Sequence, residues 1–327
     1  MKIAIPDDYQ DCVRHLDCFG KLAGHEVRVF NDSVKGTDAL AERFADAEAI
    51  VLTRERTRID AALLDRLPKL RLISQTGKLA GHVDLEACTA RGVVVAEGSG
   101  AGSATAEIAW TLALASRRHL VSEANRLRNG QWQGHLGQQL SGQRLGVWSY
   151  GRIGRQVAGY GRAFGMQVWV WGRETSTAAA RADGFEVAPT REAFFAQSDL
   201  ISLHVRLNAE TIGMVTANDL ARMKTTALLV NTSRAELIAP GALEHALAQG
   251  RPGFAAVDVY EEEPLLGANH PLLRLPNALC TPHIGYVEKD NYERYFGIAF
   301  DHIVAFAQGR LTEVVNPAAL RSPVNAG

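Results

Sequence analysis

The stretch from Val147 to Glu174 carries the residues best suited to bind a phosphate. An apolar run ends at Ser149, and Gly151 and Gly154 then open a segment with a helical pattern. Free amides at a helix start attract anions, and glycine lets a pyrophosphate approach the backbone closely. A second apolar run, residues 167–171, follows at the spacing of a strand–helix–strand unit. The stretch therefore predicts a dinucleotide-binding turn, with a purely structural turn as the alternative, although Ser149 replaces the first glycine of the usual fingerprint.

The residues after the second run indicate which dinucleotide the turn accepts. Sites for NAD place an Asp or Glu about 20 residues after the glycines, where it binds the ribose 2′-hydroxyl. Gly172 and Arg173 stand there in this chain, followed by the hydroxyl donors Thr175 and Ser176. Because a guanidinium attracts a 2′-phosphate, the sequence favours NADP(H) over NAD(H). Two other interpretations stay open: Arg173 is an ordinary surface residue, or Glu174 takes the role of the acid.

A scaffold of strands and helices has to position these residues, and the first hundred residues show the pattern of one. Short β-rich runs alternate there with amphipathic stretches such as residues 37–45 and 61–67. This alternation predicts a parallel sheet with helices on both faces, and five such units resemble the flavodoxin-like arrangement. The strand candidates are residues 2–6, 26–30, 49–53, 70–74 and 92–96.

A second α/β series follows a Gly/Ser-rich joint at residues 97–107. A long helical run covers Ala104 to Arg128, and its first part is apolar nearly all round, which predicts burial. A last helical pattern extends over residues 288–308. The series predicts a second doubly wound parallel sheet, a Rossmann domain. Its strand candidates are residues 145–149, 167–171, 200–205, 227–231, 253–259 and 278–282.

Composition excludes several classes of protein. The 327 residues are 46% hydrophobic and 22% charged with a net charge of −1, as in a globular protein of two domains without general affinity for nucleic acid or anionic membranes. No run approaches the roughly 18 apolar residues of a spanning helix, and the start, MKIAIPDD, lacks the features of a secretory signal. The four cysteines form no C-x-x-C pair and no metal-ligand spacing. We therefore expect a cytoplasmic protein with reduced thiols and no metal.

Four further motifs make the chain resemble the D-isomer-specific 2-hydroxyacid dehydrogenases over nearly its whole length. Their order and spacing form a much more specific signal than the glycine turn alone. The motifs are LLVNTSRAELI (228–238), AAVDVYEEEPL (255–265), CTPHIGY (280–286) and EVVNP (313–317). The resemblance implies an NAD(P)-dependent oxidoreductase acting on CH–OH groups, similar to glyoxylate/hydroxypyruvate reductases and phosphoglycerate dehydrogenases. Such an enzyme reduces a small 2-oxo acid at C2 to a D-2-hydroxy acid.

The same resemblance implies three catalytic residues. Arg234 matches the arginine that binds the substrate carboxylate and carbonyl, a task suited to a guanidinium because it holds an anion while polarising a ketone. His283 matches the acid/base that protonates the new alkoxide. Glu263, directly before Pro264, matches the carboxylate that pairs with this histidine and favours its charged form.

Substrate binding is implied for a loop of the first domain. Gly77, Lys78 and Leu79 correspond to the turn whose backbone amides bind the substrate carboxylate, together with Arg234. The Lys78 ammonium either attracts an acidic substrate or points to solvent, and both readings stay open. Tyr286 replaces a small residue after His283 and would narrow the pocket.

Cofactor contacts follow from the turn and from the resemblance. Asp258 matches a residue that holds the nicotinamide carboxamide, and Arg206 stands in a loop that lies along the adenosine half, where it either assists Arg173 or is a surface residue. The full predicted set is Thr105, Tyr150, Gly151, Arg152, Ile153, Gly154, Gly172, Arg173, His204, Arg206, Thr232, Asp258 and Gly285.

The predicted organisation is a substrate-binding domain of residues 1–100 and 288–327 and a cofactor domain of residues 101–287. The resemblance also suggests a homodimer through the long helix after Ala104 and the segment before Leu145, with Trp110 and Trp132 supplying apolar surface. Two other functions stay open. One is a formate- or phosphite-type oxidation on the same fold, and the other is a nucleotide-sensing corepressor or scaffold. The sequence does not select among glyoxylate, hydroxypyruvate, pyruvate and bulkier acids, because a methylene is worth only about 1–3 kcal/mol in a pocket.

Overall fold

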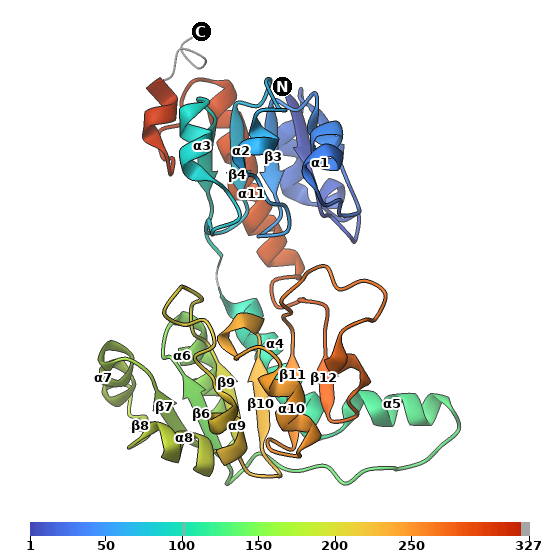
Figure 1. Ribbon diagram of the computed structural model, residues 1–327, viewed down its shortest axis with the longest axis vertical. Coiled ribbons are helices and arrows are strands. Elements are labelled where there is room, and N and C mark those ends of the chain that lie inside the picture. Colours follow the sequence, from blue (N-terminus) through green and yellow to red (C-terminus); the bar gives the residue numbers. More distant parts are fainter. Residues whose placement is uncertain (101, 322–327) are drawn as a thin grey trace. The chain divides into compact units, whose positions relative to one another are not determined.

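The computed structural model describes residues 1–100 and 102–321. Within them the chain divides into two compact units, one made of residues 1–100 and 288–321 and the other of residues 102–287 (Figure 1). The predicted domain limits at residue 101 and the predicted tail at 322–327 lie outside the described residues.

The first unit is built on a sheet of five parallel strands in the order β2-β1-β3-β4-β5. This is the flavodoxin-like order that the sequence predicts. All residues of β3 and β4 are buried, as expected for central strands covered on both faces. The strands are β1 (Lys2–Ile5), β2 (Glu26–Val29), β3 (Ala49–Leu52), β4 (Leu72–Gln75) and β5 (Val94–Glu97).

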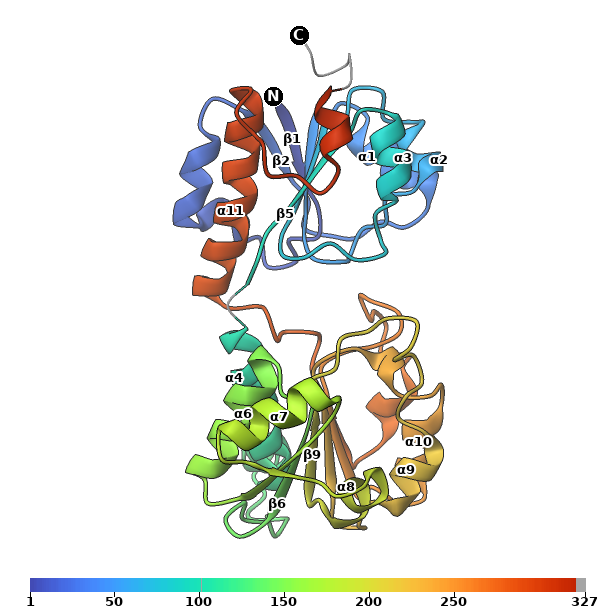
Figure 2. The same cartoon turned by 90° about the vertical axis from the view of Figure 1, so that its left-hand side faces the viewer.

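Helices cover both faces of this sheet. Figure 2 shows α1, α2 and α3 on one side and the last long helix, α11, on the other. The Ser74 hydroxyl of β4 donates to the Ala299 carbonyl of α11 (3.1 Å). The Glu293 carboxylate of α11 accepts from the N–H groups of Asp17 (2.6 Å) and Cys18 (3.0 Å). The helices are α1 (Thr37–Phe44), α2 (Ala61–Leu64), α3 (Leu85–Ala90) and α11 (Lys289–Ala307), with 3-10 turns η1 (Val13–His15), η2 (Asp17–Leu22) and η5 (Pro317–Arg321).

The second unit contains a parallel sheet of seven strands in the order β12-β11-β10-β9-β6-β7-β8. The chain order reverses beside β6, as in a Rossmann fold. Six of these strands agree with the predicted runs, whereas the two-residue β8 has no signal in the sequence. The strands are β6 (Arg144–Trp148), β7 (Gln167–Trp171), β8 (Glu186–Val187), β9 (Leu200–Leu203), β10 (Leu228–Asn231), β11 (Phe254–Val257) and β12 (Ala278–Cys280).

Two apolar clusters lie on opposite faces of the second sheet. One packs α4, α6 and α7 against the strands, and the other packs α8, α9 and α10 (Figure 2). The helices are α4 (Ser103–Arg117), α5 (Leu120–Arg128), α6 (Arg152–Ala163), α7 (Glu174–Ala182), α8 (Arg191–Gln197), α9 (Ala217–Arg222) and α10 (Ala242–Ala248), with 3-10 turns η3 (Ala235–Leu237) and η4 (Pro271–Arg274).

The predicted long helix over Ala104–Arg128 is wrong in one respect, because it is broken between α4 and α5. The Arg117 carbonyl accepts from the Gln138 N–H (2.8 Å) instead of from an amide in the next turn. The Arg117 side chain is buried and donates to Gln138 Oε1 and to the Thr226 carbonyl, both at 2.6 Å. His119 takes the left-handed conformation (φ 49°). A distant segment therefore ends α4, and neither glycine nor proline marks the break.

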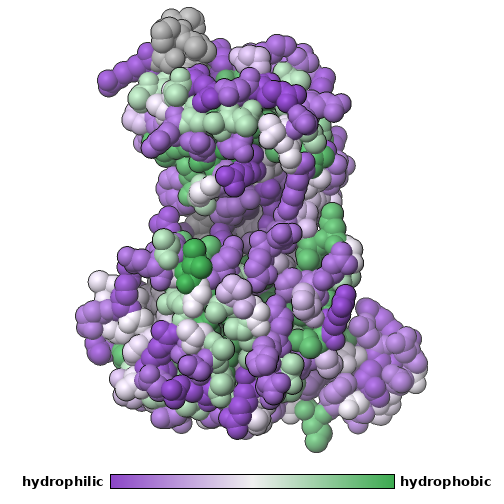
Figure 3. Space-filling view, viewed as in Figure 1, coloured by the Kyte–Doolittle hydropathy of each residue, from purple (hydrophilic) through white to green (hydrophobic). Residues whose placement is uncertain are grey.

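The predicted dimer surface also needs a correction at Trp110. This side chain is 8% exposed and packs against Tyr160 and Phe164 of its own unit, so it belongs to the core. Trp132 is 74% exposed. It lies in the segment after α5. We call α5 and this segment, residues 120–139, the arm, and Figure 3 shows the arm as mainly hydrophilic with isolated hydrophobic side chains.

Two chemical features of the described residues complete the fold. All four cysteines are free thiols. None of the helices in the described part of the chain combines the length and the hydropathy needed to cross a bilayer.

Candidate functional site

Most of the predicted site residues follow strands of the second sheet at one edge. Because its strands are parallel, their carboxyl ends meet at that edge, and the reversal of order beside β6 marks the place where such sheets bind ligands. The loops that begin there are residues 149–154 after β6, 172–173 after β7, 204–206 after β9, 232–234 after β10, 258–263 after β11 and 281–285 after β12.

An imidazole and a carboxylate form a direct pair at this edge. His283 Nδ1 lies 2.6 Å from Glu263 Oε2, and the side chains are only 11% and 14% exposed. The other carboxylate oxygen of Glu263 accepts from the Tyr260 N–H (3.0 Å). With Nδ1–H directed at the carboxylate, His283 presents Nε2 as the nitrogen that can exchange a proton. The Tyr286 ring packs edge-on against the imidazole, with ring centres 5.5 Å apart.

Asp258 holds the loop that carries this histidine. It is fully buried and accepts from the Thr281 hydroxyl (2.6 Å) and from the N–H groups of Ile284 (2.8 Å) and Gly285 (2.7 Å). Burial raises the pKa of the Asp258 carboxyl. The Thr105 hydroxyl of α4 donates to the Gly285 carbonyl (3.1 Å), so a second element fastens the same loop.

Tyr260 and Thr281 support the pair without having been predicted. The Tyr260 hydroxyl donates to the Thr281 carbonyl (3.0 Å), which also accepts from the His283 N–H (2.9 Å). His283 is thereby held in the left-handed conformation (φ 51°). Both residues lie inside the sequence motifs that carry the pair, and that position is the signal that could have identified them.

Arg234 is positioned by two of the three polar residues that precede it, Asn231 and Ser233. The Asn231 side chain donates to the Arg234 carbonyl (2.8 Å) and accepts from the Ser233 N–H (3.0 Å). The Ser233 hydroxyl donates to the Leu203 carbonyl at the end of β9 (2.7 Å). Arg234 is half-buried at the end of β10, which neighbours the strand that leads to Glu263. Asn231 and Ser233 were not predicted, although small polar residues directly after a buried strand are typical of such loops.

The turn after β6 has the shape of an anion-binding site. A Cβ on Gly154 would lie 2.1 Å from the Ser149 carbonyl oxygen, so only glycine fits there. Ser149 replaces the first glycine of the usual fingerprint and has the positive φ (77°) that a glycine adopts readily. Its N–H donates to the Trp171 carbonyl (2.7 Å). No side chain caps the start of α6, and nothing crowds the Cα of Gly151. The amides of Gly151, Ile153 and Gly154 are therefore available to a phosphate.

The other residues predicted for this turn have different surroundings. Tyr150 is 4% exposed, and its hydroxyl donates to Asp183 (2.8 Å), so its ring faces the core. The side chain of Arg152 lies beside Gly102 at the start of α4. Gly172 lies against Ser149, whose Cα is 3.5 Å from the position of a Cβ at residue 172.

Two cations lie in the loops that follow the neighbouring strands β7 and β9. Arg173 and Arg206 follow the strands on either side of β6, and both side chains are exposed. In the described part of the chain neither guanidinium forms an ion pair, whereas Glu174, the alternative acid, lies 3.2 Å from Arg181. Arg173 and Arg206 are therefore two exposed cations near the end of the turn.

Two buried polar atoms near the carboxyl ends of β9 and β10 lack protein partners among the described residues. They are Nδ1 of His204 and the hydroxyl oxygen of Thr232. The other ring nitrogen of His204 lies 2.9 Å from the Ser202 hydroxyl, and burial lowers the pKa of His204 to about 4. Buried polar atoms usually have a partner, so this pair fits a bound group with hydrogen-bonding capacity.

The predicted substrate loop of the first unit leaves two amides free. Gly77 (φ 90°) and Lys78 have N–H groups with no acceptor among the residues described, while the Leu79 N–H donates to Glu97 (2.7 Å). Lys78 Nζ pairs with the same carboxylate (2.5 Å). Arg54 Nη1 fills the space beside Gly77, 2.5 Å from the position of a Cβ there.

One further cluster has metal-ligand residue types, and its Glu261 lies in the loop after β11. Single ligand atoms of Glu244, Glu261 and His270 lie within 4.8 Å of one another. The Leu272 N–H donates to His270 Nδ1 (3.3 Å), which leaves the ring proton on Nε2, 3.1 Å from Glu261. That arrangement suits a hydrogen-bonded pair and not a metal ligand, since a metal would need the lone pair of Nε2.

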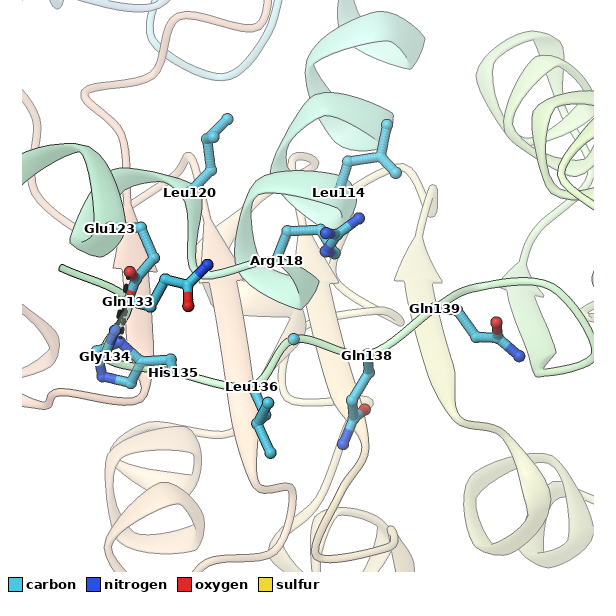
Figure 4. Close-up of a pocket in the computed structure, with 11 residues that line it drawn as sticks. Leu114, Arg118, Leu120, Glu123, Gln133, Gly134, His135, Leu136, Gln138 and Gln139 are labelled. Carbon is cyan, nitrogen blue, oxygen red and sulfur yellow. Dashed lines mark hydrogen bonds and ion pairs between the residues drawn. The ribbon is translucent and has the colours of Figure 1, made fainter. Parts of the chain in front are cut away.

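A groove lies along the arm formed by α5 and the segment after it. Glu123 of α5 accepts from the Gly134 N–H (3.1 Å) and lies 2.6 Å from His135 Nδ1, which holds the segment beside the helix (Figure 4). Leu136 is 97% exposed and Leu120 60%. The groove is lined by Leu114, Arg118, Leu120, Glu123 and residues 133–139.

The chain is similar in sequence to proteins of one known family. Residues 110–285 match the family described as D-isomer specific 2-hydroxyacid dehydrogenase, NAD binding domain. The chain is 37% identical over 279 residues to glyoxylate reductase from Aeropyrum pernix, covering 82% of each chain.

Solved structures are similar over nearly the whole chain. An oxidoreductase from Ralstonia solanacearum that carries the name D-3-phosphoglycerate dehydrogenase is 54% identical with a TM-score of 0.96, covering 99% of this chain and 98% of that one. A phosphoglycerate oxidoreductase from Vibrio cholerae is 52% identical with a TM-score of 0.92, covering 94% and 99%.

Proposed function

The chain belongs to the D-isomer specific 2-hydroxyacid dehydrogenase family, and from that premise we propose that His283, Glu263 and Arg234 catalyse its reaction. Members of this family are oxidoreductases that reduce 2-oxo acids to D-2-hydroxy acids with a nicotinamide cofactor. The observation that carries the proposal is the 2.6 Å contact between His283 Nδ1 and Glu263 Oε2.

Each residue has a task that its surroundings permit. His283 gives the proton on Nε2 to the substrate oxygen, and the Glu263 carboxylate stabilises the imidazolium before that transfer. Arg234 binds the carboxylate and polarises the C2 carbonyl, so charge that develops on the oxygen meets a fixed cation. A bound nicotinamide cofactor supplies the hydride. Asp258 and Thr105 hold the histidine loop, and in this proposal Asp258 would also bind the nicotinamide carboxamide.

The cofactor that we propose is NADP(H), in preference to NAD(H). Arg173 and Arg206 are exposed cations on the two sides of β6, and Glu174, the acid that follows Arg173, pairs with Arg181. The turn at Gly151 to Gly154 would hold the pyrophosphate. His204 and Thr232 would give their unpartnered atoms to the same molecule.

The substrate that we propose is a small 2-oxo acid whose carboxylate binds the Gly77 and Lys78 amides. The relative from Aeropyrum pernix is named glyoxylate reductase, and the oxidoreductase from Vibrio cholerae is named for phosphoglycerate. Glyoxylate, hydroxypyruvate and 3-phosphohydroxypyruvate are therefore the first acids to test.

We also propose a homodimer that forms through the arm. Trp132, Leu136, Leu120 and Leu127 are 60% to 97% exposed there, which is unusual for large apolar side chains on one segment. Sedimentation velocity distinguishes a dimer from a monomer. The cytoplasmic location and the lack of nucleic-acid or membrane partners stay predictions from the net charge of −1 and the sequence pattern.

Initial rates with NADPH and NADH test the enzyme and its cofactor together. Arg173 is the N-cap of α7, and aspartate is a favoured cap, so Arg173→Asp should fold. We expect the wild type to prefer NADPH, and Arg173→Asp to lose about 10- to 100-fold in kcat/KM for NADPH alone, since a charge-assisted contact is lost. Arg222→Asp, at an exposed arginine of α9, is the control. Equal rates with both cofactors in the wild type would refute the NADP(H) proposal, and no turnover of any 2-oxo acid would refute the catalytic one.

A further inference from the structure

Glu97 places a carboxylate on the loop that we propose for the substrate carboxylate. It is the last residue of β5, and its side chain is 25% exposed. One oxygen accepts from the Leu79 N–H (2.7 Å), and the other lies 2.5 Å from Lys78 Nζ. A backbone N–H that donates to a carboxylate forms a charge-assisted bond, roughly twice as strong as one between neutral groups.

The same strand end fastens the loop at two further points. The Gly98 N–H donates to the carbonyls of Gly77 (2.9 Å) and Gln75 (3.1 Å). The Leu79 side chain packs against the core of the first unit. Leu79 is therefore fixed by its side chain on one side and by Glu97 on the other, so the N–H groups of Gly77 and Lys78 are left without acceptors in the described residues.

Glu97 also determines which positive charge a substrate carboxylate would meet at the loop. Because its carboxylate pairs with Lys78, the ammonium is neutralised at the edge of the loop. The Arg54 backbone N–H donates to the Thr76 hydroxyl (3.0 Å), and its guanidinium lies against Gly77 and pairs with Glu55 (3.7 Å). An incoming carboxylate would meet two amides next to this guanidinium.

From these contacts we propose that Glu97 is a positioning residue for the substrate-carboxylate site. It holds Leu79 so that the amides of Gly77 and Lys78 stay free, and it keeps Lys78 out of the site. The proposal rests on the proposed function of the 77–79 loop. The new point is that the Glu97 carboxylate supports the site without occupying the position of the substrate carboxylate.

The test compares Lys78→Met with Lys78→Met/Glu97→Ala, so that the ion pair is absent from both proteins. The probe is glyoxylate, or whichever of the three 2-oxo acids the wild type reduces. We expect the second change to raise KM for the acid about tenfold, as for loss of a hydrogen bond to a charged group. kcat should stay within twofold and KM for the nucleotide should not change. Asp46→Asn, which removes the similar surface pair with Lys69 (2.6 Å), is the control and should alter neither constant.

Amide hydrogen exchange of a peptide spanning residues 76–80 gives a second readout that does not need turnover. Exchange should be faster in the double variant than in Lys78→Met, since the Leu79 N–H has lost its acceptor. An unchanged KM with unchanged exchange would overturn the proposal, and a lower KM would show that Glu97 competes with the substrate. A wild type without activity, but with faster exchange in the double variant, would instead refute the function proposed for the loop.

Discussion

At the scale of residues, the chemistry depends on how firmly one imidazole is held. His283 has an unfavourable left-handed backbone, and three contacts keep it there: Glu263 at Nδ1, the Thr281 carbonyl at its N–H and Asp258 at the two following amides. Such a conformation costs of order 1–3 kcal/mol and persists only where the surroundings fix it. Its presence beside a buried carboxylate is typical of a site that must present one nitrogen in one direction.

Glu263→Gln should lower kcat for reduction by about 100-fold, within the range of a lost acid–base contribution. The amide keeps the size of the side chain but cannot stabilise an imidazolium. KM for the nucleotide should not change, since Glu263 contacts His283 and Tyr260. The adjacent and exposed Glu262 provides the control as Glu262→Gln, which should retain full activity. Equal rates for the two variants would contradict the role of Glu263.

His204 makes a prediction about stability. Its pKa is lowered from 6.5 to about 4 by burial, so the folded protein binds fewer protons than the unfolded chain between these values. The contribution of the neutral, buried imidazole to the free energy of unfolding is therefore complete above pH 6.5 and is lost as the pH falls towards 4. On a change from pH 7 to pH 5, the free energy of unfolding of the wild type should fall by about 2 kcal/mol more than that of His204→Gln. Urea titrations followed by tryptophan fluorescence measure the difference, and parallel losses in both proteins would refute it.

At the scale of elements, α6 and the turn before it depend on one glycine. Gly154→Ala would put a methyl group 2.1 Å from the Ser149 carbonyl oxygen, so the turn or the helix must shift. We expect a loss of about 1–3 kcal/mol in the free energy of unfolding, with weaker nucleotide binding. Gly159→Ala in the same helix has open space around it and should stabilise by about 0.5–1 kcal/mol. Urea midpoints and nucleotide titration of the two variants test this contrast.

The sequence predicted most elements but not where they end. Strands such as β3 and β10 are short, mostly apolar runs between breakers, and both sheets are parallel as predicted because alternating strands and helices permit few arrangements. The break between α4 and α5 was not predictable, since it depends on Gln138 reaching the Arg117 carbonyl. Likewise, the motifs indicated His283 and Glu263, but the contact of Glu97 with Leu79 joins residues 18 apart that share no pattern.

At the scale of the whole molecule, two optical signals distinguish the unfolding of the two units. All five tryptophans, residues 110, 132, 148, 169 and 171, lie in the unit of residues 102–287. Their fluorescence therefore reports the unfolding of that unit, whereas far-UV circular dichroism reports both.

Glu293→Ala should separate the two signals. The carboxylate of this residue caps η2 through the N–H groups of Asp17 and Cys18, all within the first unit. Its loss should destabilise that unit by about 1 kcal/mol, as for other caps. The circular-dichroism transition should shift to lower urea, while the fluorescence transition stays in place. A matching shift in fluorescence would show that the two units unfold together.

The first unit is discontinuous in sequence, and this has a consequence for synthesis. Its sheet is complete once residue 97 has left the ribosome, but α11, which covers one face, begins only at Lys289. The whole of the second unit is made in between and can fold as a continuous segment. Until the last forty or so residues emerge, the face that Ser74 presents to α11 lacks that helix. The nascent chain would thus carry this sheet face without α11 for about 190 residues of elongation, or roughly 10–40 s at ~5–20 residues per second. During that interval, binding by a chaperone would favour correct assembly.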